Sequence, residues 1–354
     1  MSMLFSPVAI GRQILKNRLV MAPMTRCRSD GAGVPNDLMA AYYGQRAGAG
    51  LIVSEATASA AIGKGYLNIP GIYTDAQTAA WRPVTEAVHA AGGSIYLQIL
   101  HSGRIGHPSL LPDGALPVAP SAIRAAGQIF TATGLQDLVE PRALATAEVV
   151  ETVAQYGEAA RRAIEAGFDG VELHAASGYL PEQFLASGTN RREDRYGGTL
   201  ANRARFALEA LEAMIAAAGA DRVGMKIAPE MGFNDLHDER PTETYPYLVE
   251  QASALGIAYL HVALFGTPSA DYHALLRPRF RGPYLAGGGL TQASAEALLE
   301  SGTADAVVFG AAFIANPDLP ERMRRGAPLN APDPATYYTP GSKGYLDYPS
   351  LDAA

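Results

Sequence analysis

The sequence predicts an α/β fold, a (β/α)8 TIM barrel with an N-terminal β-hairpin cap and a long loop after the third barrel strand. Three observations lead to this prediction. Short apolar runs alternate with longer helical patterns along the 354 residues. Most helical patterns end at a glycine, as helix C-termini commonly do. Eight strands joined by crossovers of this length suit a barrel, although a doubly wound open sheet also fits the alternation.

The expected strands are short and apolar, as strands buried on both faces should be. They cover residues 19–22, 51–55, 95–100, 170–174, 223–228, 259–263, 283–286 and 306–310. Residues 5–10 and 13–16 form a hairpin-like stretch that would plug the bottom of the barrel. No linker or compositional break divides the sequence, so we expect one domain over residues 1–354.

Helices are expected at residues 37–47, 75–91, 146–166, 200–218, 242–255 and 291–301. The stretch from His101 to about Ala145 is rich in proline, glycine and alanine, and we expect it to be irregular. A connection of that length usually carries function, for instance as a lid over a site.

Composition narrows the class of protein. The net charge of −7 gives no reason to expect a nucleic acid or an anionic membrane as partner. One cysteine, Cys27, allows no internal disulfide and suits a reducing cytoplasm. No apolar run is long enough to span a bilayer, the N-terminus does not read as a secretory signal, and no metal site is expected. We expect a monomer or a homodimer that acts on a small molecule.

Polar residues gather where the expected strands end, which is where chemistry sits in such a barrel. The segment VELHAASGYLPEQFL, from Val171, places His174, Ser177 and Tyr179 on one short loop after a buried strand. Buried polar groups need partners, and a ligand is one way to supply them. For this segment alone, a structural histidine followed by a helix N-cap at Ser177 is the simpler interpretation. The recurrence of polar strand ends along the chain favours a binding site.

A glycine cluster lies on the opposite side of the expected barrel mouth. Gly287, Gly288 and Gly289 follow the seventh strand and Gly310 closes the eighth, where backbone N–H groups can hold a phosphate. Thr25, Gln98 and Lys226 face this cluster and could surround a flat heteroaromatic ring, with the cation stabilising negative charge on it. This pattern indicates flavin mononucleotide (FMN). An internal polar network at Gln98 and Lys226 is an equally open alternative.

Longer motifs then identify a family. The chain resembles the old yellow enzyme family of FMN-dependent ene reductases and NADPH dehydrogenases, which are (β/α)8 barrels. The resemblance covers essentially the whole chain and is carried by NRLVMAPMTRCRS from Asn17, YYGQRAGAGLIVSEAT from Tyr42, HSGRIGH from His101, FDGVELHAASGYLPEQFL from Phe168, TNRREDRYGGTLANRARF from Thr189, FGAAFIANPDL from Phe309 and GYLDYPSL from Gly344.

The resemblance implies roles for individual residues. His174 would donate to the carbonyl or nitro oxygen of the substrate, and Tyr179 would protonate the substrate carbon. Tyr66, Leu100 and Tyr338 match positions that face the substrate. NADPH or NADH would reduce FMN and leave before an activated alkene takes the hydride in the same place. Residues that would line FMN are Pro23, Met24, Thr25, Ala56, Gln98, His174, Lys226, Gly287, Gly288, Gly289, Gly310 and Ala311.

Four positions depart from the family pattern. Ser177 stands where the family has a histidine or asparagine as second donor to the carbonyl, and losing such a donor costs about a hundredfold in rate. Leu100 replaces a tryptophan, which either opens volume or leaves a repacked wall. Lys226 replaces an arginine at the flavin edge. Ala311 replaces an arginine that grips the phosphate, which should weaken FMN binding by one or two decades unless Arg322 or Arg324 reaches in.

These departures leave two alternatives beside an ene reductase with an altered pocket. One is a flavoenzyme on the same scaffold that isomerises or oxidises a specialised metabolite. The other is a flavin-poor descendant that binds a ligand without redox turnover. Retention of Tyr179 favours reduction, because reduction needs a proton donor.

Overall fold

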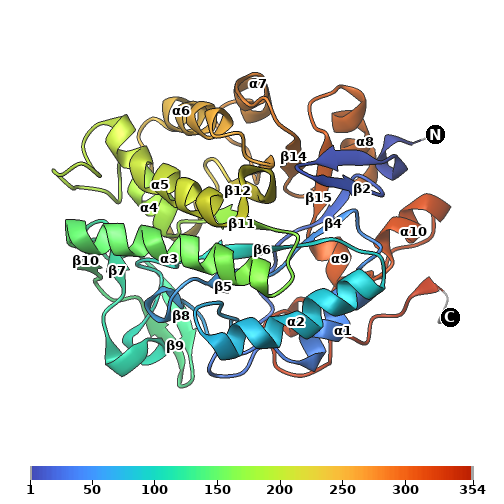
Figure 1. Cartoon of the computed structure of the whole chain (residues 1–354), viewed down its shortest axis with the longest axis horizontal. Helices are drawn as coiled ribbons and strands as arrows, with labels where there is room; N and C mark the ends of the chain where they lie inside the picture. The colour runs from blue at the N-terminus through green and yellow to red at the C-terminus, as the bar shows by residue number, and fades with distance from the viewer. Residues whose placement is uncertain (1, 352–354) are drawn as a thin grey trace.

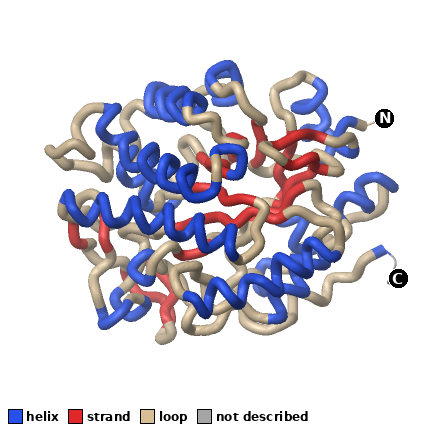
Figure 2. The backbone as a smooth tube through the Cα atoms, in the orientation of Figure 1, coloured by secondary structure: helices blue, strands red, loops and turns tan. Residues whose placement is uncertain are grey.

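Eight parallel strands close into a barrel in the computed structural model, which describes residues 2–351. In chain order they are β3 (Leu19–Met21), β4 (Leu51–Val53), β6 (Ile95–Leu100), β11 (Gly170–His174), β12 (Val223–Ile227), β13 (Tyr259–Ala263), β14 (Tyr284–Gly287) and β15 (Ala306–Phe309). Each pairs with its neighbours, and β11 pairs with both β6 and β12, which closes the circle. The barrel prediction is confirmed over the open sheet, and helices surround the strands (Figure 1 and Figure 2).

The six expected helices are present within a few residues of their predicted ends. They are α1 (Asp37–Gln45), α2 (Asp75–Ala90), α3 (Thr146–Glu165), α5 (Leu200–Ala218), α6 (Pro241–Ala254) and α8 (Gln292–Glu300). The sequence did not predict the short helices α4 (Leu180–Leu185), α7 (Tyr272–Leu276), α9 (Ala311–Ala315) and α10 (Leu319–Arg325). Each has at most two turns, too few for a helical period to stand out.

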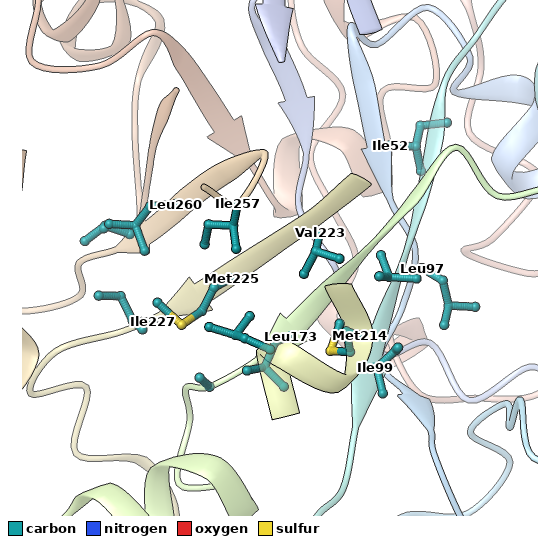
Figure 3. Packing of buried hydrophobic residues seen from close by; sticks show 14 of the residues in the cluster. Ile52, Leu97, Ile99, Leu173, Met214, Val223, Met225, Ile227, Ile257 and Leu260 are labelled. Carbon is teal, nitrogen blue, oxygen red and sulfur yellow. The ribbon is translucent and has the colours of Figure 1, made fainter. Parts of the chain in front are cut away.

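The strands alternate between two environments. Outward side chains such as Leu97, Leu173 and Met225 pack against the helices, as Figure 3 shows for part of this cluster. Inward side chains at the lower end form a second apolar cluster, which includes Ile10 and Leu15 of the N-terminal hairpin. That hairpin, β1 (Val8–Ile10) with β2 (Gln13–Leu15), therefore plugs the barrel bottom as predicted (Figure 1).

The connection after β6 is more ordered than expected. It contains a β-hairpin, β8 (Gln128–Thr131) with β9 (Gly134–Asp137), and a short parallel pair, β7 (Val118–Ala119) with β10 (Arg142–Ala143). The prediction of an irregular stretch was wrong because these strands are only two to four residues long, too short for an alternating pattern to stand out. Buried residues of this connection, Ala125, Ile129 and Leu138, pack with Leu100 and Tyr179.

A two-residue strand, β5 (Thr57–Ala58), pairs with the end of β6. Short 3-10 helices cover Met3–Phe5, Ala61–Gly63, Pro108–Leu110, Pro112–Gly114, Ala220–Arg222, Phe233–Asp235, Arg277–Arg279 and Pro334–Thr336. Within residues 2–351, no helix is long and apolar enough to cross a membrane. The same residues contain no group of three or more histidine, cysteine or acidic side chains that could hold a metal ion.

Candidate active site

The register of the parallel strands brings the predicted polar residues together inside the barrel. His174 of β11 lies opposite Lys226 of β12, and Lys226 lies opposite His261 of β13. Gln98 of β6 lies opposite Glu172 of β11. Alternate residues of a barrel strand face inward, so Glu172 and His174 share the interior face. These side chains form a polar layer above the apolar plug.

Glu172 organises this layer. Its carboxylate accepts hydrogen bonds from Gln98 Nε2 at 2.7 Å and from the Tyr259 hydroxyl at 3.1 Å, and it lies 3.1 Å from His261 Nδ1. The amide nitrogen of Gln98 is therefore occupied, and its oxygen forms no hydrogen bond with any described residue. Gln98 is thus part of an internal network, and its amide oxygen is left available as an acceptor. We missed Glu172 and His261 in the sequence, although Glu172 stands two positions before His174.

Several polar atoms at the mouth have no partner among residues 2–351. His174 is 5% exposed, and its Nδ1 has no hydrogen-bond partner. The Lys226 ammonium and the Thr25 hydroxyl form no hydrogen bond with described residues either. Burial lowers the pKa of Lys226, while the Glu172 carboxylate opposes that shift. Together the site offers a buried acceptor, a hydroxyl, a cation and an unpartnered imidazole. This set of groups suits the polar edge of a flavin ring.

Burial holds the pKa of His174 well below its usual value, and the charge of Lys226 lowers it further. The imidazole is therefore neutral and offers one N–H and one acceptor nitrogen. A neutral imidazole can donate its N–H to a carbonyl oxygen and keep its own proton.

The predicted phosphate cradle would consist of the backbone N–H groups of Gly288, Gly289, Gly310 and Ala311. None of these four N–H groups donates a hydrogen bond to a described residue. Gly288 has φ of 105°, and a Cβ there would lie 1.8 Å from the carbonyl oxygen of Leu264. Only glycine fits at that position. Four free N–H groups on two neighbouring strand ends suit a phosphate, so the residues present fit FMN.

Neither Arg322 nor Arg324 takes the place of the arginine that the family pattern predicts at the exposed position Ala311. The Arg322 guanidinium bonds to the Asp318 carboxylate at 2.7 Å and to the carbonyl oxygens of Pro328 and Pro349. The Arg324 guanidinium lies over the Phe5 ring, 4.7 Å from its centroid. Both side chains are used elsewhere, so the expected loss of phosphate affinity is not offset by either of them.

Restoring the cation should tighten FMN binding. We expect Ala311→Arg to lower the dissociation constant of FMN by about 10- to 100-fold, because a charge-assisted pair contributes about 1.5–3 kcal/mol. Fluorescence titration of the apoprotein measures this. Ala311→Gln, with a long uncharged side chain, is the control and should change the constant less than threefold. Equal effects of arginine and glutamine would contradict a charge-based explanation.

The loop after β11 places Tyr179 beside Tyr66 and His174. The two tyrosine hydroxyls are 3.0 Å apart, and the His174 and Tyr179 rings meet edge to face with centroids 4.9 Å apart. Burial raises the pKa of Tyr179 well above its usual value, and the neighbouring Tyr66 raises it further. Tyr179 therefore keeps its proton at neutral pH and can act as a proton donor. Tyr338 is 67% exposed and lies near enough to raise the pKa of both Tyr66 and Tyr179.

The remaining predicted residues fall around this centre. Pro23, Met24 and Thr25 follow β3 and are partly exposed, and Ala56 follows β4. Leu100 is buried and packs with Tyr179 and the loop after β6, which favours a repacked wall over an opened one. The Ser177 hydroxyl contacts the Met231 sulfur at 3.5 Å. Burial raises the pKa of Cys27 to about 12, so its thiol is not a nucleophile at neutral pH.

A buried carboxyl group beside the site makes stability depend on pH. Burial raises the pKa of Glu55 from 4.5 to about 7, although Arg26 and Tyr43 oppose the shift. The folded state therefore holds a proton that the unfolded state releases, and Glu55 should cost about 3 kcal/mol of stability as pH rises from 4.5 through 7. We expect Glu55→Gln to lose correspondingly less stability than the wild type between pH 5 and pH 8 in denaturant unfolding. Identical pH dependence in both proteins would contradict this.

Comparison with known proteins places this site in a family. Residues 3–330 match the family model described as "NADH:flavin oxidoreductase / NADH oxidase family". A probable flavin mononucleotide-dependent alkene reductase of Leishmania infantum is 44% identical over 98% of this chain and 97% of the relative. Morphinone reductase, solved in complex with tetrahydroNAD, is 48% identical with a TM-score of 0.95 over 99% of this chain and 98% of that chain.

The old yellow enzyme homologue from Zymomonas mobilis is 41% identical, with a TM-score of 0.96 over 98% of this chain and 99% of that chain. These comparisons confirm the expected fold and the use of FMN with a nicotinamide reductant. They also confirm the NAD(P)H-dependent reduction of activated alkenes. The chain belongs to the old yellow enzyme family of NADH:flavin oxidoreductases.

Proposed function

We propose that this ene reductase reduces alkenes conjugated to a carbonyl or nitro group with His174 as the oxygen-binding donor and Tyr179 as the proton donor. The observation that carries the proposal is the contact between the neutral imidazole of His174 and the protonated phenol of Tyr179 beside a ring of unpartnered polar atoms. Bound FMN supplies hydride transfer between the nicotinamide and the alkene. The side chains bind the substrate, polarise it and protonate it.

Each residue contributes one elementary step. An N–H of His174 donates to the substrate oxygen and stabilises the negative charge that develops there. Tyr179 then gives its proton to the substrate carbon, and the hydroxyl of Tyr66, 3.0 Å away, stabilises the phenolate left behind. The Ser177 side chain is too short to supply the second donor usual at its position, so we propose that small cyclic enones are poor substrates.

The setting of the reaction is part of the same proposal. Resemblance to NADPH dehydrogenases supports NADPH as a reductant beside NADH. The single cysteine, Cys27, which is only partly buried and forms no disulfide, supports a reducing, cytoplasmic compartment.

The direct test is anaerobic turnover of the FMN-loaded protein. NADPH or NADH should bleach the flavin absorbance, and an enone, nitroalkene or maleimide should restore it and appear as the saturated product by mass spectrometry. Bleaching without restoration by any of the three acceptor classes would contradict an alkene reductase. Restoration with isomerised rather than saturated product would favour an isomerase.

A further inference from the structure

The turn of residues 177–179, called the catalytic turn below, has an uncommon backbone. Ser177 and Gly178 both lie in the left-handed region, with φ of 61° and 73°. A Cβ on Gly178 would lie 2.8 Å from Asn234 Cβ and 2.8 Å from the Phe233 carbonyl oxygen. Such a backbone persists only where its surroundings hold it. Since the catalytic turn carries Tyr179, what holds it also sets the position of the phenol.

A cavity of about 380 Å³ borders the catalytic turn, and its walls include Ser177, Gly178, Met231 and Tyr245. Hydrogen bonds to the backbone tie the turn in place. The side-chain amide of Gln183 donates to the Gly178 carbonyl oxygen at 2.7 Å, and that of Asn234 donates to the Ser177 carbonyl oxygen at 2.8 Å.

Glu182 completes this set and links the turn to a separate element. One oxygen of its carboxylate accepts from the Gly178 N–H at 2.6 Å, and the other accepts from the Tyr245 hydroxyl at 2.5 Å. Glu182 is 1% exposed and Tyr245 is 3% exposed. Glu182 lies in the first turn of α4, whereas Tyr245 lies on α6. Both oxygens are thus used within the protein, and the carboxylate connects the catalytic turn to the outer ring of helices.

We propose that Glu182 is a positioning residue for Tyr179. Its carboxylate links the Gly178 N–H to the Tyr245 hydroxyl. This link fixes the direction in which Tyr179 presents its phenol to the substrate carbon. The inference rests on the proposed role of Tyr179 as proton donor. Small displacements of a reacting group cost large factors in rate, so loss of this support should slow proton transfer selectively.

Stopped-flow measurements on FMN-loaded variants test the inference. Glu182→Leu removes both acceptors and leaves the Gly178 N–H buried without a partner. We expect it to slow reoxidation of the reduced protein by 2-cyclohexenone about 10- to 100-fold. Reduction by NADPH or NADH, and reoxidation by ferricyanide, which needs no proton at carbon, should stay within twofold. Glu182→Gln keeps an oxygen for the Gly178 N–H and should stay within threefold of the wild type in all three reactions.

Two further variants make the test decisive. Tyr245→Phe keeps the hydrogen bond from the Gly178 N–H to Glu182 but removes the one from the Tyr245 hydroxyl. We expect a 3- to 10-fold slower reaction with 2-cyclohexenone and no change in the other two reactions. It serves as the test if Glu182→Leu does not fold. Thr244→Val, on the same helix as Tyr245, removes a buried hydroxyl that has no hydrogen-bond partner among residues 2–351. It should change none of the three rates.

Unchanged reoxidation by 2-cyclohexenone in the Leu and Phe variants would overturn the proposal. An equal fall of all three rates would also overturn it, because Glu182 would then support the fold at large. Failure of the proposed function has a different outcome: the wild type itself would be reduced by NADPH or NADH and reoxidised by ferricyanide, but not by any enone, nitroalkene or maleimide.

Discussion

Tyr179→Phe should slow reoxidation of the reduced protein by 2-cyclohexenone about 100- to 10,000-fold while leaving reduction by NADPH or NADH within twofold. General acid catalysis by a positioned side chain contributes a factor of this size. The phenol is 7% exposed, and burial keeps it protonated, so no solvent molecule replaces it easily. Anaerobic stopped-flow spectroscopy of both half-reactions separates the two rates.

Tyr66→Phe is the matched control for this substitution. It removes the hydroxyl 3.0 Å from Tyr179 but leaves the proton donor itself in place. Its effect on the reaction with 2-cyclohexenone should therefore stay below tenfold. If Tyr66→Phe is as damaging as Tyr179→Phe, the roles of the two tyrosines are wrongly assigned. If Tyr179→Phe reacts within threefold of the wild type, the proton comes from another group.

Ser177→Asn should raise kcat/KM for 2-cyclohexenone about a hundredfold. An oxygen-binding donor is worth about that factor in rate, and serine is too short to act as one here. Asparagine suits the position because it tolerates the left-handed backbone better than most residues, and Ser177 has φ of 61°. Steady-state kinetics with the purified FMN-loaded variants measures the gain.

Ser177→Ala tests whether the existing hydroxyl contributes. That hydroxyl contacts the Met231 sulfur, so its removal should change kcat/KM less than twofold. A tenfold loss in the alanine variant would show that serine already serves as the donor. No gain in the asparagine variant would show that a single donor, His174, is sufficient for this pocket.

The barrel strands were predictable because a buried parallel strand leaves a strong local pattern. The run 170–174 is a clear example, since it lies at the same residues in the structure as in the prediction. The carboxyl ends of parallel strands meet at one end of a barrel. The predicted strand ends therefore placed His174, Lys226 and the glycines at the same end. The two-residue alternation of this strand places Glu172 on the same interior face as His174, a signal that could have identified it.

The supports of the site were not predictable in the same way. Glu182 and Asn234 act through hydrogen bonds to the backbone of the catalytic turn, and neither stands in a periodic pattern that points there. The availability of Arg322 for a phosphate likewise depended on Asp318 and two distant carbonyl oxygens. Such partners follow from how loops fold against one another, which local sequence does not specify.

The central claim is that FMN lies over the barrel mouth with its phosphate on the N–H groups of Gly288, Gly289, Gly310 and Ala311. Titration of the apoprotein with FMN and with riboflavin, which lacks the phosphate, tests it most directly. We predict saturable binding of one FMN per chain and at least tenfold weaker binding of riboflavin. Absence of saturable FMN binding, or equal affinity for the two flavins, would contradict the claim.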